Sequence, residues 1–175
     1  ASPYTFLVGP VHVSFNNGTP DFIHPDLDTF INTEARVVTS ATGQLEWDWG
    51  TGVVVLNAPR AQGVVGALSS RPFFGLRDIT IESEATYASV VVVPLDGLPI
   101  ATSTQLLVQI NSIARPTGWR ARPASHESGQ ALEVIEFGGA PWQVDRVDAR
   151  LTLRNLAGLS RATALDANGM ATSSV

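Results

Sequence analysis

The chain has 175 residues and a net charge of −5, and apolar residues make up 44% of it while charged residues make up only 15%. This balance is typical of a folded globular chain and excludes a disordered one, and the acidic charge argues against nucleic acid as a partner because phosphate binding requires clustered cations. There is no cysteine, so disulfides and thiolate metal sites are excluded, and no apolar run approaches the roughly 20 residues that span a bilayer, so we expect no membrane partner.

The first third of the chain contains one helical pattern. Residues 4–15 alternate loosely and predict a first strand, and the Asn-Asn-Gly-Thr-Pro sequence at 16–20 predicts a turn. Within residues 26–33, apolar side chains recur at i, i+3 and i+4, which is the spacing of a helix face. The sequence therefore predicts at most one short helix.

The most informative stretch lies between residues 37 and 62. Residues 45–49 read Leu-Glu-Trp-Asp-Trp, and their apolar and acidic side chains alternate with the period of two expected of a strand with one buried face. The Gly-Thr-Gly sequence at 50–52 predicts a tight reversal, because glycine reaches positive φ without steric cost. A valine run at 53–56 then predicts the returning strand. Trp47 shares a face with Leu45, so we predict that its ring is structural.

The rest of the chain is rich in strand patterns. We predict strands at 63–68, 76–84, 87–93, 105–113, 132–137, 144–153 and 162–165, and loops at 71–75, 115–129 and 138–141. The β-branched run at 87–93 predicts a strand buried on both faces. Roughly nine to eleven strands at intervals of about 8–12 residues are typical of an all-β sandwich. We therefore predict a single antiparallel β-sandwich domain over residues 1–175, of jelly-roll or immunoglobulin-like type. Because the chain does not begin with Met, we expect it to be a fragment of a larger multidomain protein.

The order of several motifs resembles a known module. Thr-Gly-Gln-Leu-Glu-Trp-Asp at 42–48 is followed by a glycine turn, a valine strand and Pro-Arg-Ala-Gln at 59–62. Leu-Asp-Gly-Leu-Pro at 95–99 and Ala-Leu-Asp-Ala-Asn-Gly at 164–169 continue the likeness. Together they resemble the C-terminal β-sandwich accessory domain, similar to a carbohydrate-binding module, of bacterial glycoside hydrolases. In those proteins this domain follows a (β/α)8 barrel that carries catalysis, so the resemblance implies no catalytic residue here.

The resemblance implies a non-catalytic carbohydrate-binding or accessory module of a polysaccharide-degrading enzyme. The expected partners are a polysaccharide or oligosaccharide and the catalytic domain of the parent enzyme, and the expected location is secreted or periplasmic. A bacterial source also fits the 11 basic residues, which are all arginine. The alternative is a ligand-free structural or interaction domain that packs on a catalytic or assembly partner. Large exposed apolar surface would favour packing, and a groove with an exposed Trp would favour glycan binding.

Aromatic rings with polar neighbours are the candidate sugar-binding residues. A pyranose places its C–H groups against the electron-rich face of such a ring, while flanking polar groups bind its hydroxyls. Trp119 lies in the predicted polar loop beside Arg120, and Trp49 lies next to the 50–52 turn. Trp142 follows Gly-Gly-Ala-Pro and is predicted to be a packing anchor. The arginines around Trp119 suit an acidic or sulfated polysaccharide, unless they pair with the domain's own carboxylates.

The acidic pairs and the possible metal ligands predict neither catalysis nor a metal site. Glu46 and Asp48 lie about 7 Å apart by strand rise, a spacing found in inverting glycosidases, but acids at i, i+2 are also ordinary on a solvent-facing strand. The three histidines lack zinc-site spacing. A structural calcium near Asp26 and Asp28, or at the Asp166 turn, stays open as a minor alternative. No other cofactor is expected, and there is no nucleophile-elbow or phosphate-loop motif.

Overall fold

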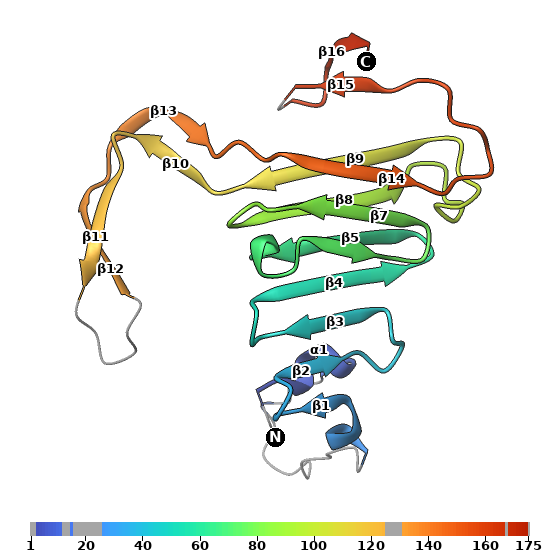
Figure 1. Cartoon of the computed structure of the whole chain (residues 1–175), viewed down its shortest axis with the longest axis horizontal. Coiled ribbons are helices and arrows are strands. Elements are labelled where there is room, and N and C mark those ends of the chain that lie inside the picture. The colour runs from blue at the N-terminus through green and yellow to red at the C-terminus, as the bar shows by residue number, and fades with distance from the viewer. Residues whose placement is uncertain (1–2, 12–14, 16–25, 125–130, 167, 175) are drawn as a thin grey trace.

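The computed structural model describes residues 3–11, 15, 26–124, 131–166 and 168–174. Over these ranges the chain is all-β with antiparallel pairing, and it contains one α-helix, α1 (Thr5–Val8), and two 3-10 helices, η1 (Leu27–Phe30) and η2 (Leu68–Ser70). The predicted all-β class with at most one short helix is confirmed for the described residues. Figure 1 shows a body of stacked strands with a bent ribbon extending from one side.

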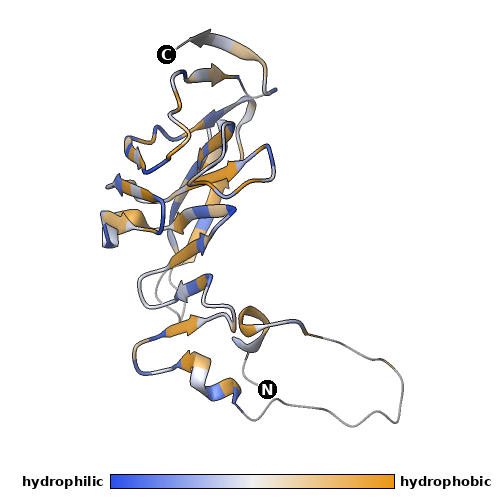
Figure 2. Cartoon of the chain, turned by 90° about the vertical axis from the view of Figure 1, so that its right-hand side faces the viewer, coloured by the Kyte–Doolittle hydropathy of each residue, from blue (hydrophilic) through white to orange (hydrophobic). Residues whose placement is uncertain are grey.

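The body contains two sheets. The larger has seven strands in the order β1-β2-β3-β4-β5-β8-β9, and the smaller has three in the order β14-β7-β6. The strands of the larger sheet are β1 (Ile31–Asn32), β2 (Val37–Thr39), β3 (Leu45–Asp48), β4 (Val53–Ala58), β5 (Ala61–Gly66), β8 (Ala88–Pro94) and β9 (Leu106–Ser112). Those of the smaller sheet are β6 (Phe73–Gly75), β7 (Ile79–Ser83) and β14 (Ala149–Leu153). Figure 2 shows hydrophobic stretches along the strands of this body.

The core lies between these sheets. Ile79 and Ile81 of β7 are fully buried in one cluster with Val64 of β5 and with Val90 and Val92 of β8. The predicted alternation in residues 76–84 is thus confirmed, since Ile79 and Ile81 point inward. The prediction that residues 87–93 are buried on both faces is wrong, because every second residue of β8 is only half-buried. The smaller sheet covers one face of the larger sheet and leaves the other face of β8 partly open.

A two-stranded ribbon, which we call the arm, connects β9 to β14. Its proximal part pairs β10 (Ala114–Thr117) with β13 (Gly139–Val144), and its distal part pairs β11 (Arg120–Ala124) with β12 (Ala131–Glu136). Figure 1 shows the arm leaving the body beside β9 and β14 and bending away from the sheets. A separate hairpin of β15 (Thr163–Leu165) and β16 (Ala171–Ser174) follows β14.

Several predicted elements differ from the structure, and these differences have a physical cause. The strand predicted at 4–15 contains α1 instead, because the rings of Tyr4 and Phe6 pack on Trp47 and no strand pairs with the described residues of this segment. The loop predicted at 71–75 contains β6, which pairs with β7 and fully buries Phe74. The loops predicted at 115–129 and 138–141 contain arm strands, which pair with each other and so need no alternating apolar face. The turn predicted at 16–20 lies outside the described residues.

Candidate functional site

The bend between the proximal and distal arm positions Trp119 and Arg120. The backbone N–H of Trp119 donates to the carbonyl of Pro116 at 3.1 Å, which closes a turn, and Arg120 then begins β11 opposite Glu136. The opposite strand bends at Gly138, where φ is +68°. A Cβ there would lie 2.1 Å from the carbonyl oxygen of Thr117, so only glycine allows the two strands to approach this closely.

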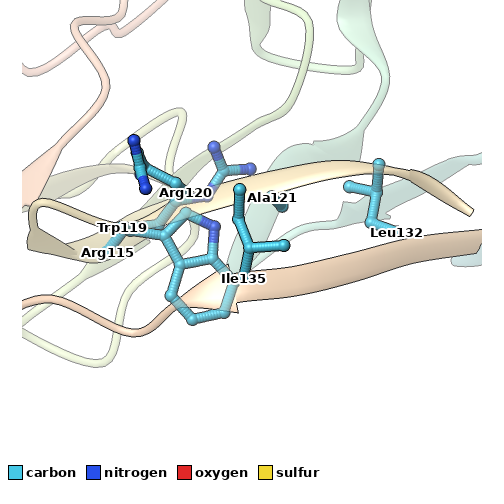
Figure 3. Close-up of a pocket in the computed structure, with 6 residues that line it drawn as sticks. All are labelled: Arg115, Trp119, Arg120, Ala121, Leu132 and Ile135. Atoms are coloured by element: carbon cyan, nitrogen blue, oxygen red, sulfur yellow. The ribbon is translucent and has the colours of Figure 1, made fainter.

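Trp119 forms one end of a shallow depression that lies mostly on the distal arm and includes Arg115 of the proximal arm. The depression has a volume of about 500 Å³ and is lined by Arg115, Trp119, Arg120, Ala121, Leu132 and Ile135. The Trp119 ring is half-buried and packs edge-to-face with Phe137, at a centroid distance of 5.5 Å. Figure 3 shows the two guanidinium groups on the same side of the indole ring and Leu132 at the far end. The sequence-based candidates Trp119 and Arg120 therefore lie together.

The arginines of the distal arm have exposed acidic partners. The Nε of Arg120 lies 2.9 Å from Glu136, and Arg122 lies 2.8 Å from Glu133, with every side chain more than half exposed. Such exposed pairs contribute only about 0–1 kcal/mol, so other ligands can compete for them. Among the described residues, no acidic side chain lies within 4 Å of the Arg115 guanidinium. Within the described part of the chain, Arg120 and Arg122 therefore pair with the chain's own carboxylates, whereas Arg115 does not.

Trp49 does not belong to this depression. It lies in the turn between β3 and β4, and its ring stacks on Tyr4 with a centroid distance of 4.2 Å and an interplanar angle of 12°. The half-buried ring of Trp47 lies 6.0 Å away in the same aromatic cluster. Trp49 therefore belongs to the body, whereas Trp119 belongs to the arm, and Figure 1 separates the two elements. Trp49 is not among the residues that line the depression, so the structure does not bring it together with Trp119 and Arg120 there.

Asp48, one member of the Glu46–Asp48 pair, has structural partners. Asp48 Oδ1 accepts hydrogen bonds of 2.9 Å from the backbone N–H groups of Gly50 and Thr51, which fixes the β3–β4 turn. Burial raises the pKa of Asp48, but the bonds from Thr51 and Gly50 outweigh it, so the pKa lies below its ordinary value. The predicted reversal at Gly52 is confirmed by its φ of +75°.

Of the possible metal ligands, Asp166 has other contacts, and the three histidines lie outside the described residues. Asp166 Oδ1 accepts hydrogen bonds from the backbone N–H groups of Asn168 and Met170, as expected of a turn. Hydrogen bonds from Met170 and then Asn168 lower the pKa of Asp166. No group of three His, Asp or Glu side chains that could hold a metal ion occurs in the described part of the chain. The histidines at 12, 24 and 126 lie outside it.

A second feature is the uncovered core face at β9. Val108 and Ile110 pair with Val92 and Val90, whose side chains are fully buried in the core. Directly paired residues share a face of the sheet, so Val108 and Ile110 also lie on the core face. They are nevertheless 39% and 47% exposed. The smaller sheet therefore does not cover the core face at this edge of the larger sheet.

Exposed apolar side chains also lie on the proximal arm, which follows β9 after Ile113. Side chains alternate along a strand, so Ala114 and Pro116 lie on one side of β10. Ala114 pairs with Val144 and Pro116 pairs with Trp142. Val144 is 71% exposed and Trp142 is 67% exposed, so the prediction that Trp142 is a packing anchor within the chain is wrong. We call these four side chains, with Val108 and Ile110, the apolar strip.

Comparisons with known proteins identify no relative of this chain. No family model matches it, and neither a curated protein nor a solved structure matches it. In the described residues, no helix is long and apolar enough to cross a membrane. The function therefore has to be argued from the arm, the apolar strip and the sequence motifs.

Proposed function

We propose that this chain is a non-catalytic accessory module of a polysaccharide-degrading bacterial glycoside hydrolase, and that it packs against the catalytic domain through the apolar strip. The exposure of this strip beside the hydrophobic core carries this proposal. Apolar side chains left uncovered on β9 and on the arm next to it are suited to receive an apolar layer from a partner. The class of partner comes from the motif resemblance, and a secreted or periplasmic location belongs to the same proposal.

The free edge of β9 supports a packing role. Among the described residues, β9 pairs with β8 on one side only, so its other edge leaves backbone groups for a partner to cover.

The positions of the acidic side chains support a non-catalytic role. Asp48 holds a turn, and Glu133 and Glu136 pair with arginines on the exposed arm. A glycosidase instead uses two carboxyl groups that flank one sugar-binding cleft, with the pKa of the acid raised. The pKa values of Asp48, Asp96 and Asp166 all lie below the ordinary value of the carboxyl group.

Two assays on the isolated chain test this proposal. The neutral dye Nile red should bind the isolated chain, and the double variant Trp142→Ser/Val144→Ser should bind much less dye while melting at nearly the same temperature. The control Leu95→Ser/Leu98→Ser removes two exposed apolar side chains from the β8–β9 connection and should bind dye like the parent. Unchanged dye binding by the first variant would contradict the strip. Turnover of chromogenic glycosides that Glu46→Gln or Asp48→Asn abolishes would contradict the non-catalytic role.

Glycan binding is the second candidate function. It is favoured by the depression at Trp119, which lies mostly on the distal arm. Arg115 of the proximal arm also lines it, but Arg115 alternates with Ala114 and Pro116 and so lies on the other side of β10 from the strip. The two roles are therefore compatible on one arm.

A further inference from the structure

We infer that the depression at Trp119 binds an anionic sugar unit, one that carries a carboxylate or a sulfate group. This inference rests on the proposed carbohydrate context, but it does not depend on packing by the apolar strip. It combines an aromatic surface for the sugar ring with arginine donors for the anionic group.

The aromatic surface is the Trp119 ring. Phe137 contacts it at an interplanar angle of 80°, and an edge-to-face neighbour covers at most one face of an indole. Ala121, Leu132 and Ile135 extend the apolar lining of the depression beyond the ring. A pyranose can therefore place its C–H groups on the indole while its substituents reach the polar rim.

The rim carries two arginines, one of which is paired with Glu136. Arg115 and Arg120 line the depression, and no acidic side chain is among the described residues that line it. Arg115 has no acidic partner among the described residues, and Arg120 contacts Glu136 through Nε. Because a guanidinium group has five N–H donors, this single contact leaves donors for an oxyanion. Arginine donates in the same manner to the oxygens of a carboxylate and of a sulfate. The arginines therefore indicate a ligand with either of these anionic groups.

Because the net charge of the chain is negative, binding to an anionic polymer distinguishes a local site from attraction by the whole molecule. At a charge of −5, the molecule as a whole repels an anionic polymer at low salt, so retention by such a polymer reports a local site. A site for a neutral sugar would not need two arginines that line the same depression.

Affinity electrophoresis of the full chain at low salt provides the test, with two matched pairs of polymers. Polygalacturonate and its methyl-esterified form share a backbone and differ in carboxylate charge, while dextran sulfate and dextran differ in sulfate. We expect retardation by polygalacturonate, by dextran sulfate or by both, and none by the two neutral polymers. The two pairs thereby distinguish a carboxylate ligand from a sulfate ligand. Equal retardation by the charged and neutral members, or no retardation by any of the four, would overturn the inference.

Variants locate the site. Arg115→Ala and Trp119→Ala should each weaken the apparent affinity about tenfold, the loss expected when one charged hydrogen bond or one stacked ring is removed. Trp119→Phe should retain most of the binding, which separates loss of the ring from misfolding. The controls Arg146→Ala, which removes a charge paired with Asp148, and Phe73→Ala, which removes an exposed ring from β6, should bind like the parent. Binding that survives Trp119→Ala and Arg115→Ala, or falls equally in the controls, would overturn the site while leaving the dye assay of the apolar strip unaffected.

Discussion

At the scale of one residue, Gln62 shows the role of a motif on which the family resemblance rests. It is the last residue of the Pro-Arg-Ala-Gln sequence and is fully buried. Its Nε2 donates to Asp78 Oδ2 at 2.6 Å, and its Oε1 accepts from the backbone N–H of Asp78 at 2.9 Å. These bonds connect β5 of the larger sheet to the turn between β6 and β7 of the smaller one. The motif residue is therefore structural.

Replacing Gln62 by Leu should lower the free energy of unfolding by about 1–3 kcal/mol, because Asp78 loses both partners at a part-buried position. Urea denaturation followed by circular dichroism measures the change. Gln44→Leu is the matched control, since Gln44 is exposed, and it should unfold like the parent. Equal midpoints for the parent and Gln62→Leu would show that the polar link does not hold the sheets together.

Asp96 has a comparable role in the β8–β9 connection. Its carboxylate accepts hydrogen bonds from the backbone N–H groups of Leu98 and Thr104 and from the Thr104 hydroxyl. Desolvation raises the pKa of Asp96, but these bonds and one from Ser103 outweigh it and lower the pKa from 3.8 to about 2.

The lowered pKa of Asp96 predicts a pH dependence. A group whose pKa is lower in the folded chain stabilises the fold above its unfolded pKa, and this contribution is lost as the pH falls through the folded pKa. The melting temperature of the parent should therefore exceed that of Asp96→Asn at neutral pH, and the gap should narrow as the pH falls from 3.8 to about 2. A gap that stays constant across this range would contradict a role for the Asp96 charge.

At the scale of elements, a strand can be predicted from the sequence where apolar and polar side chains alternate and so indicate which face is buried. β7 alternates between the buried Ile79 and Ile81 and the more exposed Thr80 and Glu82, and its strand was predicted. β10 and β11 contain Arg-Pro and β13 contains Ala-Pro, and their apolar and polar side chains do not alternate cleanly. Each of these strands pairs with another arm strand outside the core. The sequence therefore indicated Trp119 and Arg120 as neighbours in a polar region, but it could not indicate an arm or a depression between two strands.

The bend of the arm can be tested by substituting one glycine. Gly138→Ala places a Cβ against the Thr117 carbonyl at positive φ, which costs at least about 1–2 kcal/mol and should open the arm about tenfold more often. Within the arm, trypsin can cut only after Arg120, because Arg115 and Arg122 precede proline. Cleavage after Arg120, followed by mass spectrometry, should therefore be faster in Gly138→Ala. Gly139→Ala meets no atom within 4 Å and should be cut like the parent. Equal rates for both variants would contradict a bend that depends on Gly138.

At the scale of the whole molecule, the arm divides into two regions with different chemistry. The proximal arm carries exposed apolar side chains next to β9, and the depression lies mostly on the distal arm. Under the proposed function, the apolar side would pack on a catalytic domain and the depression would hold an anionic sugar. Figure 1 shows the bend that separates these two regions.

The central claim is that the apolar strip is covered in the complete protein, and hydrogen–deuterium exchange tests it most directly. Exchange is compared between the isolated chain and the protein made from its complete gene, over residues 106–117 and 139–144. We predict amide exchange at least about tenfold slower in the complete protein, because a partner that packs on the strip suppresses local opening. The seven-stranded sheet near β4 and β5 serves as the internal reference and should exchange alike in both samples. Equal exchange of the two segments in both samples, or a gene that encodes no further domain, would contradict the account.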